Sequence, residues 1–436
     1  MLGNPFSRRG VAALFGAPGR PLAIDFGATA LKILQVSDAT PPAIIAAASL
    51  PTPEALLNDP PKRLAFQFAQ LPALVKAARV TSRRAMAAIP TWAVCVKHMQ
   101  VPTSELDQLT DYCTSMLSAD LMCDPGMLMC RALQVPTAHA GGAAGSGKTE
   151  VIATACPSAL VQRVMDALRS ANLTCVGIMP EPLAMVHAFD RITSRESDSG
   201  LVSLYVDMGY SGTRVTIAHG REVVFSKTIE VGGRYMDECL AELSRCTLIE
   251  ASTLRAKLAA AGAECAAADG VRAAASMSGG AASKAVTNGG TPHLDAAVKL
   301  ADDASAVATA EERRTGKLPR GFARAEPGAL DPRLVESLGV LTDEVSLCLR
   351  YHDALFPGMK MGRAVFVGGE SRHVGICHHV ARALRVPGSV ADPLACFSRP
   401  AHKAAAIAGP GALLDLTRQQ PGWAVCAGLC MATTDF

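Results

Sequence analysis

The sequence predicts an α/β protein made of two related half-domains that face each other across a cleft, with a small α+β subdomain inserted in the first half. Two stretches about 180 residues apart share one pattern, LAIDFGATALK at 22–32 and LVSLYVDMGYSGTRVT at 201–216. Each combines an apolar strand, an aspartate, a turn with glycine and a second strand. A third apolar strand, AVFVGGES at 364–371, runs into two consecutive glycines. The repeated hairpin indicates two halves of similar architecture.

Length and composition fit a globular chain of two or three compact units. The 436 residues exceed one simple core, and 49% are apolar. A formal net charge of +3 gives no basic surface for nucleic acid, so we expect no nucleic-acid partner. The 14 cysteines form no C-x-x-C pair, which favours reduced thiols in a cytoplasmic protein. No apolar run reaches the roughly 18 residues of a membrane span.

The first half is predicted to comprise residues 21–100 and 181–200, after a flexible N-terminal tail at 1–20. Its hairpin is followed by an expected helix at 64–80 and expected strands at 85–89 and 93–99. The tail is expected to contact lipid headgroups only weakly.

The inserted subdomain is predicted over residues 101–180 from its order of helix, strand, strand, helix and strand. Thr103 or Ser104 is expected to cap the first helix, and Ser158 the second. The expected strands lie at 127–135, 150–156 and 175–179.

Between the first two of these strands, Gly142–Thr149 matches a P-loop pattern, Gly-Ala-Ala-Gly-Ser-Gly-Lys-Thr. A working P-loop needs a helix directly after it, because the phosphates bind at the helix N-terminus. The residues that follow, Val-Ile-Ala-Thr, are rich in β-branched side chains and predict a strand instead. We interpret the stretch as a hairpin connection, and a P-loop ATPase that uses Gly142–Thr149 stays as an alternative.

The second half is predicted to comprise residues 201–250 and 331–436. A strand at 225–231 ends at two glycines, and a helix is expected to resume at Asp331 with Leu334, Leu338, Leu341, Val345 and Cys348 on one face. Between the two parts, residues 251–330 are dominated by alanine, serine and glycine. This composition predicts a variable, partly disordered subdomain.

The two hairpins suit a phosphate ligand. Their glycines let a ligand approach the backbone, and consecutive N–H groups in such a turn form an anion-binding concavity. An aspartate at the strand end suits a hydrated divalent cation. A single hairpin of this kind is explained without any ligand, and the recurrence of the pattern is what favours a binding site.

Six segments occur in the order typical of one protein family. They are LFGAPGRPLAIDFGATALKILQV at 14–36, EPLA at 181–184, VDMGYSGTRVTIAHGREVVFSKTIEVGG at 206–233, VFVGGESRHVGICHHVARALRVP at 365–387, VADPLACF at 390–397 and WAVCAGLCMA at 423–432. With these segments the chain resembles the PilM family, the cytoplasmic actin-like proteins of type IV pilus assembly. That family belongs to the actin-like ATPase superfamily and is related to the FtsA family of cell division.

The resemblance implies an ATP site with Mg²⁺ between the two halves. The residues expected to hold the nucleotide are Asp25, Gly27, Ala28, Thr29 and Lys32 of the first hairpin, Asp207, Gly209, Ser211, Gly212 and Thr213 of the second, and Gly232, Gly233, Gly368 and Gly369. Asp25 and Asp207 are expected to bind Mg²⁺ mainly through water. Glu181 matches the position that orients the attacking water in some relatives. Glu370 replaces a third glycine, which predicts a crowded or redirected loop.

For function, the resemblance implies an adaptor with at most slow ATP hydrolysis, peripheral to the inner membrane. It would hold the cytoplasmic tail of a PilN-like inner-membrane protein of a pilus or type II secretion system, with the tail on residues 93–180. Self-assembly is a further property that the family suggests. The alternatives are an FtsA-like membrane-associated cytoskeletal ATPase and a sugar kinase of the same fold, for which no catalytic aspartate was found between the hairpins.

Overall fold

The computed structural model describes residues 20–135, 147–190, 200–258, 332–398, 414, 416 and 418–432. All but the last residue of the predicted tail at 1–20, nearly all of the predicted variable subdomain at 251–330 and the glycine-rich part of 142–149 therefore lie outside the described residues. Among the described helices, none combines the length and apolar character that crossing a membrane requires. The described cysteines are free thiols.

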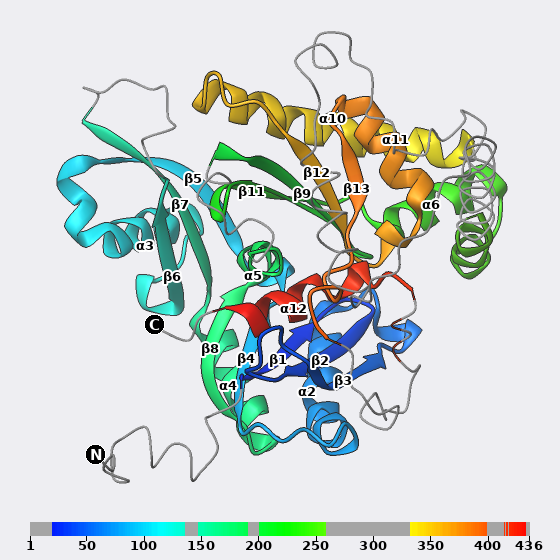
Figure 1. Cartoon of the computed structure of the whole chain (residues 1–436). Helices are drawn as coiled ribbons and strands as arrows, with labels where there is room; N and C mark the ends of the chain where they lie inside the picture. Colours follow the sequence, from blue (N-terminus) through cyan, green and yellow to red (C-terminus); the bar gives the residue numbers. More distant parts are fainter. Residues whose placement is uncertain are drawn as a thin grey trace, which may run out of the picture.

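Two five-stranded sheets with the same strand order form the frame of the molecule (Figure 1). The first has the order β3-β2-β1-β4-β8, with β1 (Leu22–Phe26), β2 (Ala30–Val36), β3 (Ile44–Pro51), β4 (Arg84–Ile89) and β8 (Thr174–Pro180). The second has the order β11-β10-β9-β12-β13, with β9 (Val202–Met208), β10 (Thr213–His219), β11 (Glu222–Ile229), β12 (Arg363–Val367) and β13 (Gly388–Val390). In each sheet three antiparallel strands are followed by two parallel ones. The predicted duplication is confirmed.

The outer face of the first sheet is covered by α2 (Pro60–Ala77) and α4 (Ser158–Ser170), which pack against Leu22, Ile24 and Ile33. Helix α2 begins four residues before the predicted start at 64. The Asp59 side chain accepts a hydrogen bond from the Lys62 amide, and prolines occupy the first helical positions, where they cost no hydrogen bond.

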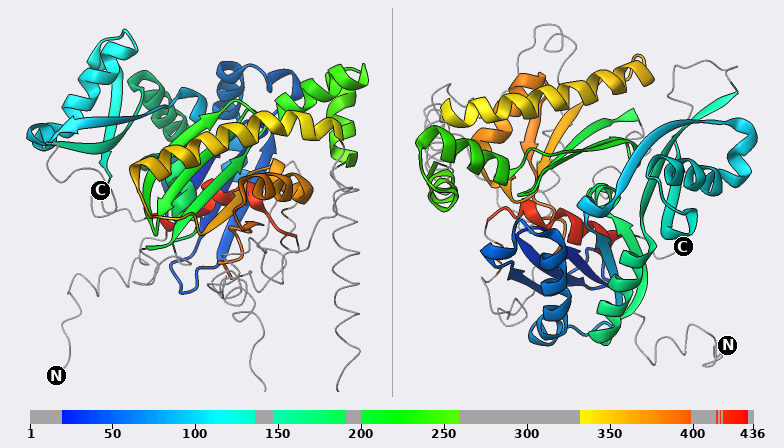
Figure 2. Two further views of the ribbon diagram at one scale, coloured as in Figure 1. Left: turned by 90° about the horizontal axis from the view of Figure 1, so that it is seen from above. Right: turned by 180° about the vertical axis from the view of Figure 1, so that it is seen from behind.

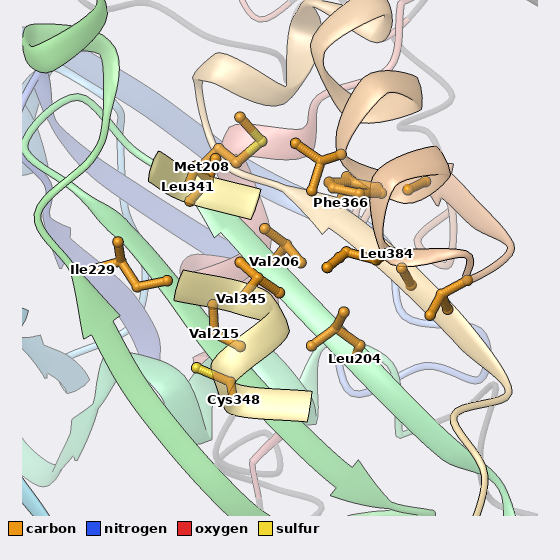
Figure 3. Close-up of a cluster of buried hydrophobic side chains, with 14 of the residues drawn as sticks. Leu204, Val206, Met208, Val215, Ile229, Leu341, Val345, Cys348, Phe366 and Leu384 are labelled. Carbon is orange, nitrogen blue, oxygen red and sulfur yellow. The ribbon is translucent and has the colours of Figure 1, made fainter. Parts of the chain in front are cut away.

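On the second sheet, α6 (Gly233–Ser244), α10 (Pro332–Leu355) and α11 (Val374–Leu384) cover the outer face (Figure 1). The five residues predicted to share one face of α10 are all buried there. Figure 3 shows three of them, Leu341, Val345 and Cys348, packed over β9 and β10. The helical spacing therefore located this part of the core correctly.

Two short helices, α5 (Glu181–His187) and α12 (Ala424–Met431), lie between the sheets (Figure 1). Every residue of α12 except Met431 is buried. The two helices touch closely at Gly428, where an added Cβ would overlap the carbonyl oxygen of Ala184. This layer joins the two halves and sets the inner wall of the space between them.

A third sheet has the order β5-β7-β6 and carries α3 (Leu109–Asp120). Its strands are β5 (Cys95–Pro102), β6 (Leu128–Gln134) and β7 (Lys148–Pro157), and Figure 2 shows the unit projecting from one side of the frame. The predicted limits of the insert at 101–180 differ from this unit at both ends. It takes in β5, whereas β8 pairs in parallel with β4, and α4 covers the first sheet.

Lys148 begins β7, so the P-loop-like stretch leads into a strand, as predicted, and not into the helix that a P-loop requires.

One aromatic contact links the projecting unit to the second half. The His98 ring of β5 stacks on Phe225 of β11 at a centroid distance of 4.7 Å, and Tyr351 of α10 meets the His98 ring edge at 5.8 Å. The Ser226 amide also lies 3.3 Å from His98 Nε2.

Candidate functional site

A cleft lies where the two halves meet. It is lined by both hairpin turns, by Glu181, by the glycine pair at 368–369 and by a C-terminal stretch of Pro421, Gly422, Ala424 and Val425. The predicted site residues are therefore brought together, with three exceptions, Thr213, Gly232 and Gly233, which lie outside the lining.

These three residues support the second hairpin from behind. The Thr213 hydroxyl donates to the Val231 carbonyl at 2.6 Å, and the Gly233 amide donates to the Gly209 carbonyl at 3.0 Å. A Cβ added at Gly232 would meet the Gly209 oxygen at 2.5 Å, so only glycine fits against this turn. The double glycine shapes the hairpin and does not face the cleft.

In the first hairpin, Asp25 and Lys32 are direct partners across β1 and β2. Lys32 Nζ lies 3.5 Å from Asp25 Oδ2 and donates to the Gly422 carbonyl at 2.6 Å. Burial raises the pKa of Asp25, and the Lys32 charge acts in the opposite direction. Gln67 of α2 holds the turn by donating to the Gly27 carbonyl at 2.8 Å.

The second hairpin turn is closed by a backbone hydrogen bond and is covered by Gly368. The Gly209 amide donates to the Gly212 carbonyl at 3.0 Å. Gly368 has a φ of 95°, and a Cβ there would overlap Asp207 and the Met208 backbone. Position 368 therefore requires glycine for both its backbone angle and its space.

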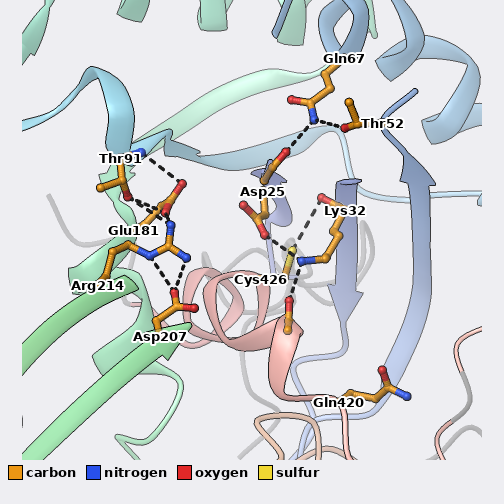
Figure 4. A network of polar contacts seen from close by, with 12 residues as sticks. Asp25, Lys32, Thr52, Gln67, Thr91, Glu181, Asp207, Arg214, Gln420 and Cys426 are labelled. Atoms are coloured by element: carbon orange, nitrogen blue, oxygen red, sulfur yellow. Dashed lines mark hydrogen bonds and ion pairs between the residues drawn. The ribbon is translucent and has the colours of Figure 1, made fainter. Parts of the chain in front are cut away.

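Arg214, which sequence reasoning missed, lines the cleft and lies between Asp207 and Glu181 (Figure 4). Its Nε and Nη2 lie 2.9 and 2.7 Å from Asp207 Oδ2, and its Nη1 lies 2.5 Å from Glu181 Oε2. Thr91 adds two hydrogen bonds to Glu181, from its hydroxyl at 2.6 Å and its amide at 3.3 Å. One guanidinium thus links the second half to the first.

Electrostatics favour this pairing. Burial opposes the charge of Arg214, but Asp207 and Glu181 outweigh it, so the pKa of the guanidinium is raised above its usual value. Burial also raises the pKa of Glu181, against the effect of the Arg214 charge.

The sequence did contain a signal for Arg214. Lys32 stands seven positions after Asp25, and Arg214 stands seven positions after Asp207. In both hairpins the basic residue is the direct cross-strand partner of the aspartate. Aligning the hairpins over their full length would have placed Arg214 beside Lys32 in the predicted site.

Glu370, expected to crowd the adenosine loop, is paired with a second arginine. Arg255, in the helical residues 248–258, bonds Glu370 and also donates to Asp237 of α6, with Nε 2.6 Å from Oδ1. Burial raises the pKa of Glu370, and the Arg255 charge lowers it. The carboxylate therefore faces an internal cation beside Gly233 and lines the cleft.

The site fits a polyphosphate better than it fits Mg²⁺. The glycines at 27 and 209 keep side chains out of the turns, where an added Cβ would meet the backbone oxygens of Ala30 and Gly212 at 3.1 and 3.0 Å. The predicted metal ligands, in contrast, are already paired, Asp207 with Arg214 and Asp25 with Lys32. Among the described residues no group of three or more histidine, cysteine, aspartate or glutamate side chains is placed to hold a metal ion.

Duplicated sheets of this order, with a hairpin from each half and a glycine pair around one cleft, define the actin-like ATPase fold. The chain is similar in structure to a chain of the PilM-PilN type IV pilus biogenesis complex, with a TM-score of 0.60, 19% sequence identity and coverage of 95% of this chain and 98% of that chain. That similarity confirms the fold predicted from the sequence. No protein-family model matches the chain, and no curated protein matches it.

Two more distant structures were also found. The ethanolamine utilization protein EutJ from Carboxydothermus hydrogenoformans has a TM-score of 0.43 at 12% identity, covering 95% of this chain and 90% of that chain. MreB5 of Spiroplasma citri, bound to ADP, has a TM-score of 0.41 at 11% identity, covering 86% of this chain and 92% of that chain.

Proposed function

We propose that this chain is a PilM-like adaptor that binds a nucleotide between its halves and holds the cytoplasmic tail of a PilN-like inner-membrane protein. The observation that carries the proposal is the structural similarity to a chain of the PilM-PilN complex, which extends over 95% of this chain. It therefore spans the frame and the projecting sheet together. In this role the protein is cytoplasmic and peripheral to the inner membrane.

The nucleotide is expected to lie with its phosphates at the two hairpin turns and its adenosine near Gly368 and Gly369. Three features support this placement: the turns supply backbone N–H groups, Lys32 supplies a cation, and glycines allow close approach. Glu181 is bonded by Thr91 and Arg214, so we favour nucleotide binding over turnover.

The tail is expected to bind the projecting unit. Exposed apolar side chains gather there in α3, in the turn that follows it and at the start of β6, namely Met116, Leu121, Met122, Met127 and Met129. Met122 is 92% exposed and Met127 is 61% exposed. Exposed apolar surface of this kind marks protein-binding sites, and flexible methionines adapt to a peptide.

Nucleotide and tail binding are expected to be coupled through β5. His98 of this strand stacks on Phe225 of the second half, so closure of the cleft moves one wall of the projecting unit. Coupling free energies of this kind are about 1–3 kcal/mol, and they act equally in both directions.

The test is calorimetry with a synthetic peptide that carries the cytoplasmic tail of the PilN-like protein from the same cell, with and without ATP. The account predicts binding that ATP tightens about 5-fold or more. The double variant Met122→Gln, Met127→Gln should lose the peptide and keep the nucleotide, because both side chains are exposed. Peptide binding that is unchanged in this variant would contradict the assigned surface, and no peptide binding at all would contradict the adaptor function.

A further inference from the structure

We propose that Arg214 is the built-in cation of the cleft, so that a nucleoside polyphosphate binds there without a divalent metal ion. The inference deepens the proposed function and rests on it, because it concerns nucleotide binding in the same cleft. It is carried by the geometry of one buried cluster and by its charge.

Arg214 lies beside Asp207, one of the two predicted metal ligands, and bridges it to Glu181. The side chain is 20% exposed, whereas those of its partners Asp207 and Glu181 are only 4% and 5% exposed. Three nitrogens of the guanidinium contact the two carboxylates at 2.5 to 2.9 Å. Such planar, multidentate pairing of arginine with carboxylates is strong and specific in geometry.

Mg²⁺ and Arg214 exclude each other at this position. Mg²⁺ requires near-octahedral oxygen ligands at about 2.0–2.1 Å and keeps much of its water, which must in turn bond carboxylate oxygens. Oδ2 of Asp207 already accepts from two Arg214 nitrogens. A divalent ion placed there would also be repelled by the adjacent guanidinium.

The charge count supports the same conclusion. Four carboxylates line the cleft, and that of Glu370 is paired with Arg255. The remaining three, those of Asp25, Glu181 and Asp207, share two cations, Lys32 and Arg214. Without Arg214 the set would carry two excess negative charges, which a divalent ion neutralises. With Arg214 only one remains, and burial raises the pKa values of both Asp25 and Glu181, so the set leaves less negative charge for a divalent ion to neutralise.

The same contacts remove Glu181 from the role predicted for it. Its Oε2 accepts from Arg214 and from the Thr91 hydroxyl, and its Oε1 accepts from the Thr91 amide. A carboxylate held in this way is not available to orient an attacking water. The ion pair of Arg214 and Glu181 therefore holds the two halves together. The bound nucleotide is retained and is not hydrolysed.

The experiment measures the affinity for a fluorescent ATP analogue in excess EDTA and in excess Mg²⁺. Wild-type protein should bind equally in both, within about twofold. Arg214→Ala should acquire a metal requirement, with at least about tenfold tighter binding in Mg²⁺ than in EDTA. Arg214→Lys keeps the charge and should stay independent of metal. Arg221→Ala is the matched control, because Arg221 pairs with the buried Asp190 outside the cleft lining and its loss should change nothing.

A second measurement needs no nucleotide. Titration with Mn²⁺ followed by electron paramagnetic resonance should show no tight site in the wild-type cleft and one site in Arg214→Ala. Adding Asp207→Asn should abolish that site.

The outcomes separate the two proposals. Wild-type binding that appears only with Mg²⁺ would overturn the role of Arg214 and leave the nucleotide site standing. Absence of binding in both buffers would overturn the nucleotide site and this inference with it. The wild-type comparison decides the question even if Arg214→Ala does not fold.

Discussion

The two Asp-x-Gly hairpins occupy equivalent places in the two halves, yet their aspartates have different partners. Among the described residues, Asp25 pairs loosely with Lys32, at 3.5 Å, and that lysine also donates to the C-terminal stretch at Gly422. Asp207 is held by two nitrogens of Arg214, which also reaches Glu181 in the other half. Duplication preserved the backbone, and one side chain decides which hairpin joins the halves.

The chemistry of the two cations explains the difference. A lysine ammonium is a compact point charge that carries three donors and moves easily. A guanidinium is a rigid planar fork that can bond two carboxylates at once. The second hairpin is therefore a structural joint between the halves, whereas the first keeps a more mobile cation beside the cleft. The following predictions test this contrast, beginning with the largest effect.

Removing the two cations should have unequal effects on stability. Arg214→Ala leaves Asp207 and Glu181 buried without a cationic partner, and breaking a buried ion pair in this way costs about 3–5 kcal/mol. Lys32→Ala affects one carboxylate whose partner is already 3.5 Å away, so its cost should be clearly smaller. Urea denaturation of both variants measures the difference. Equal urea midpoints for the two variants would contradict the proposed difference between the hairpins.

The glycines that contact each hairpin should also differ. Gly368→Ala combines a φ of 95° with overlap onto Asp207, for a cost of about 2–4 kcal/mol. Gly422→Ala is the matched change at the residue whose carbonyl accepts from Lys32 of the first hairpin, and a new Cβ there would meet only the backbone of Gly369 and Gly368, at 3.6 Å or more, an ordinary contact. Thermal unfolding should show a large loss for the first and almost none for the second. A loss of similar size in both would contradict this difference between the two glycines.

The aspartates themselves should respond oppositely to neutralisation. Asp207→Asn weakens charge-assisted hydrogen bonds to Arg214, which are worth about 1.5–3 kcal/mol each. The folded-state pKa of Asp25 is raised by burial, so the stability that its protonated form contributes is present below about pH 4 and is lost as pH rises through the raised value.

Because asparagine mimics that protonated form, Asp25→Asn should be at least as stable as wild type at about pH 7. The difference in stability between the variant and wild type should decrease as the pH falls toward about 4. Denaturation curves at several pH values provide the test. Destabilisation by Asp25→Asn that matches that of Asp207→Asn at neutral pH would contradict it.

The sequence predicted what repeats or is periodic. Both hairpins, the double glycine at 368 and the buried face of α10 follow from local patterns, because strand alternation and helical spacing are set within a few residues. The assignment of α4 and β8 failed because β8 pairs in parallel with β4, more than 80 residues earlier in the chain, as the register of Arg84 with Thr174 shows. Parallel pairing of distant strands leaves no local signal.

The site was predicted less completely, for a related reason. A basic residue in a strand can face either side until the register is known, so Arg214 could not be placed beside Asp207 from its own segment alone. Its second partner, Glu181, comes from the other half. Arg255 and the C-terminal residues at 421–425 likewise reach the cleft only through tertiary packing, so the sequence predicted the backbone of the site and not its ion pairs.

The central claim is that the cleft between the two hairpins binds a nucleotide, and equilibrium titration of a fluorescent ATP analogue against three variants tests it. Thr29→Glu and Ser211→Glu place a negative charge in each turn at exposed positions, so folding is retained while the phosphates are repelled. Lys148→Ala alters the P-loop-like stretch. The account predicts at least about tenfold weaker binding in each glutamate variant and wild-type affinity in Lys148→Ala. Loss of binding in Lys148→Ala alone would contradict it.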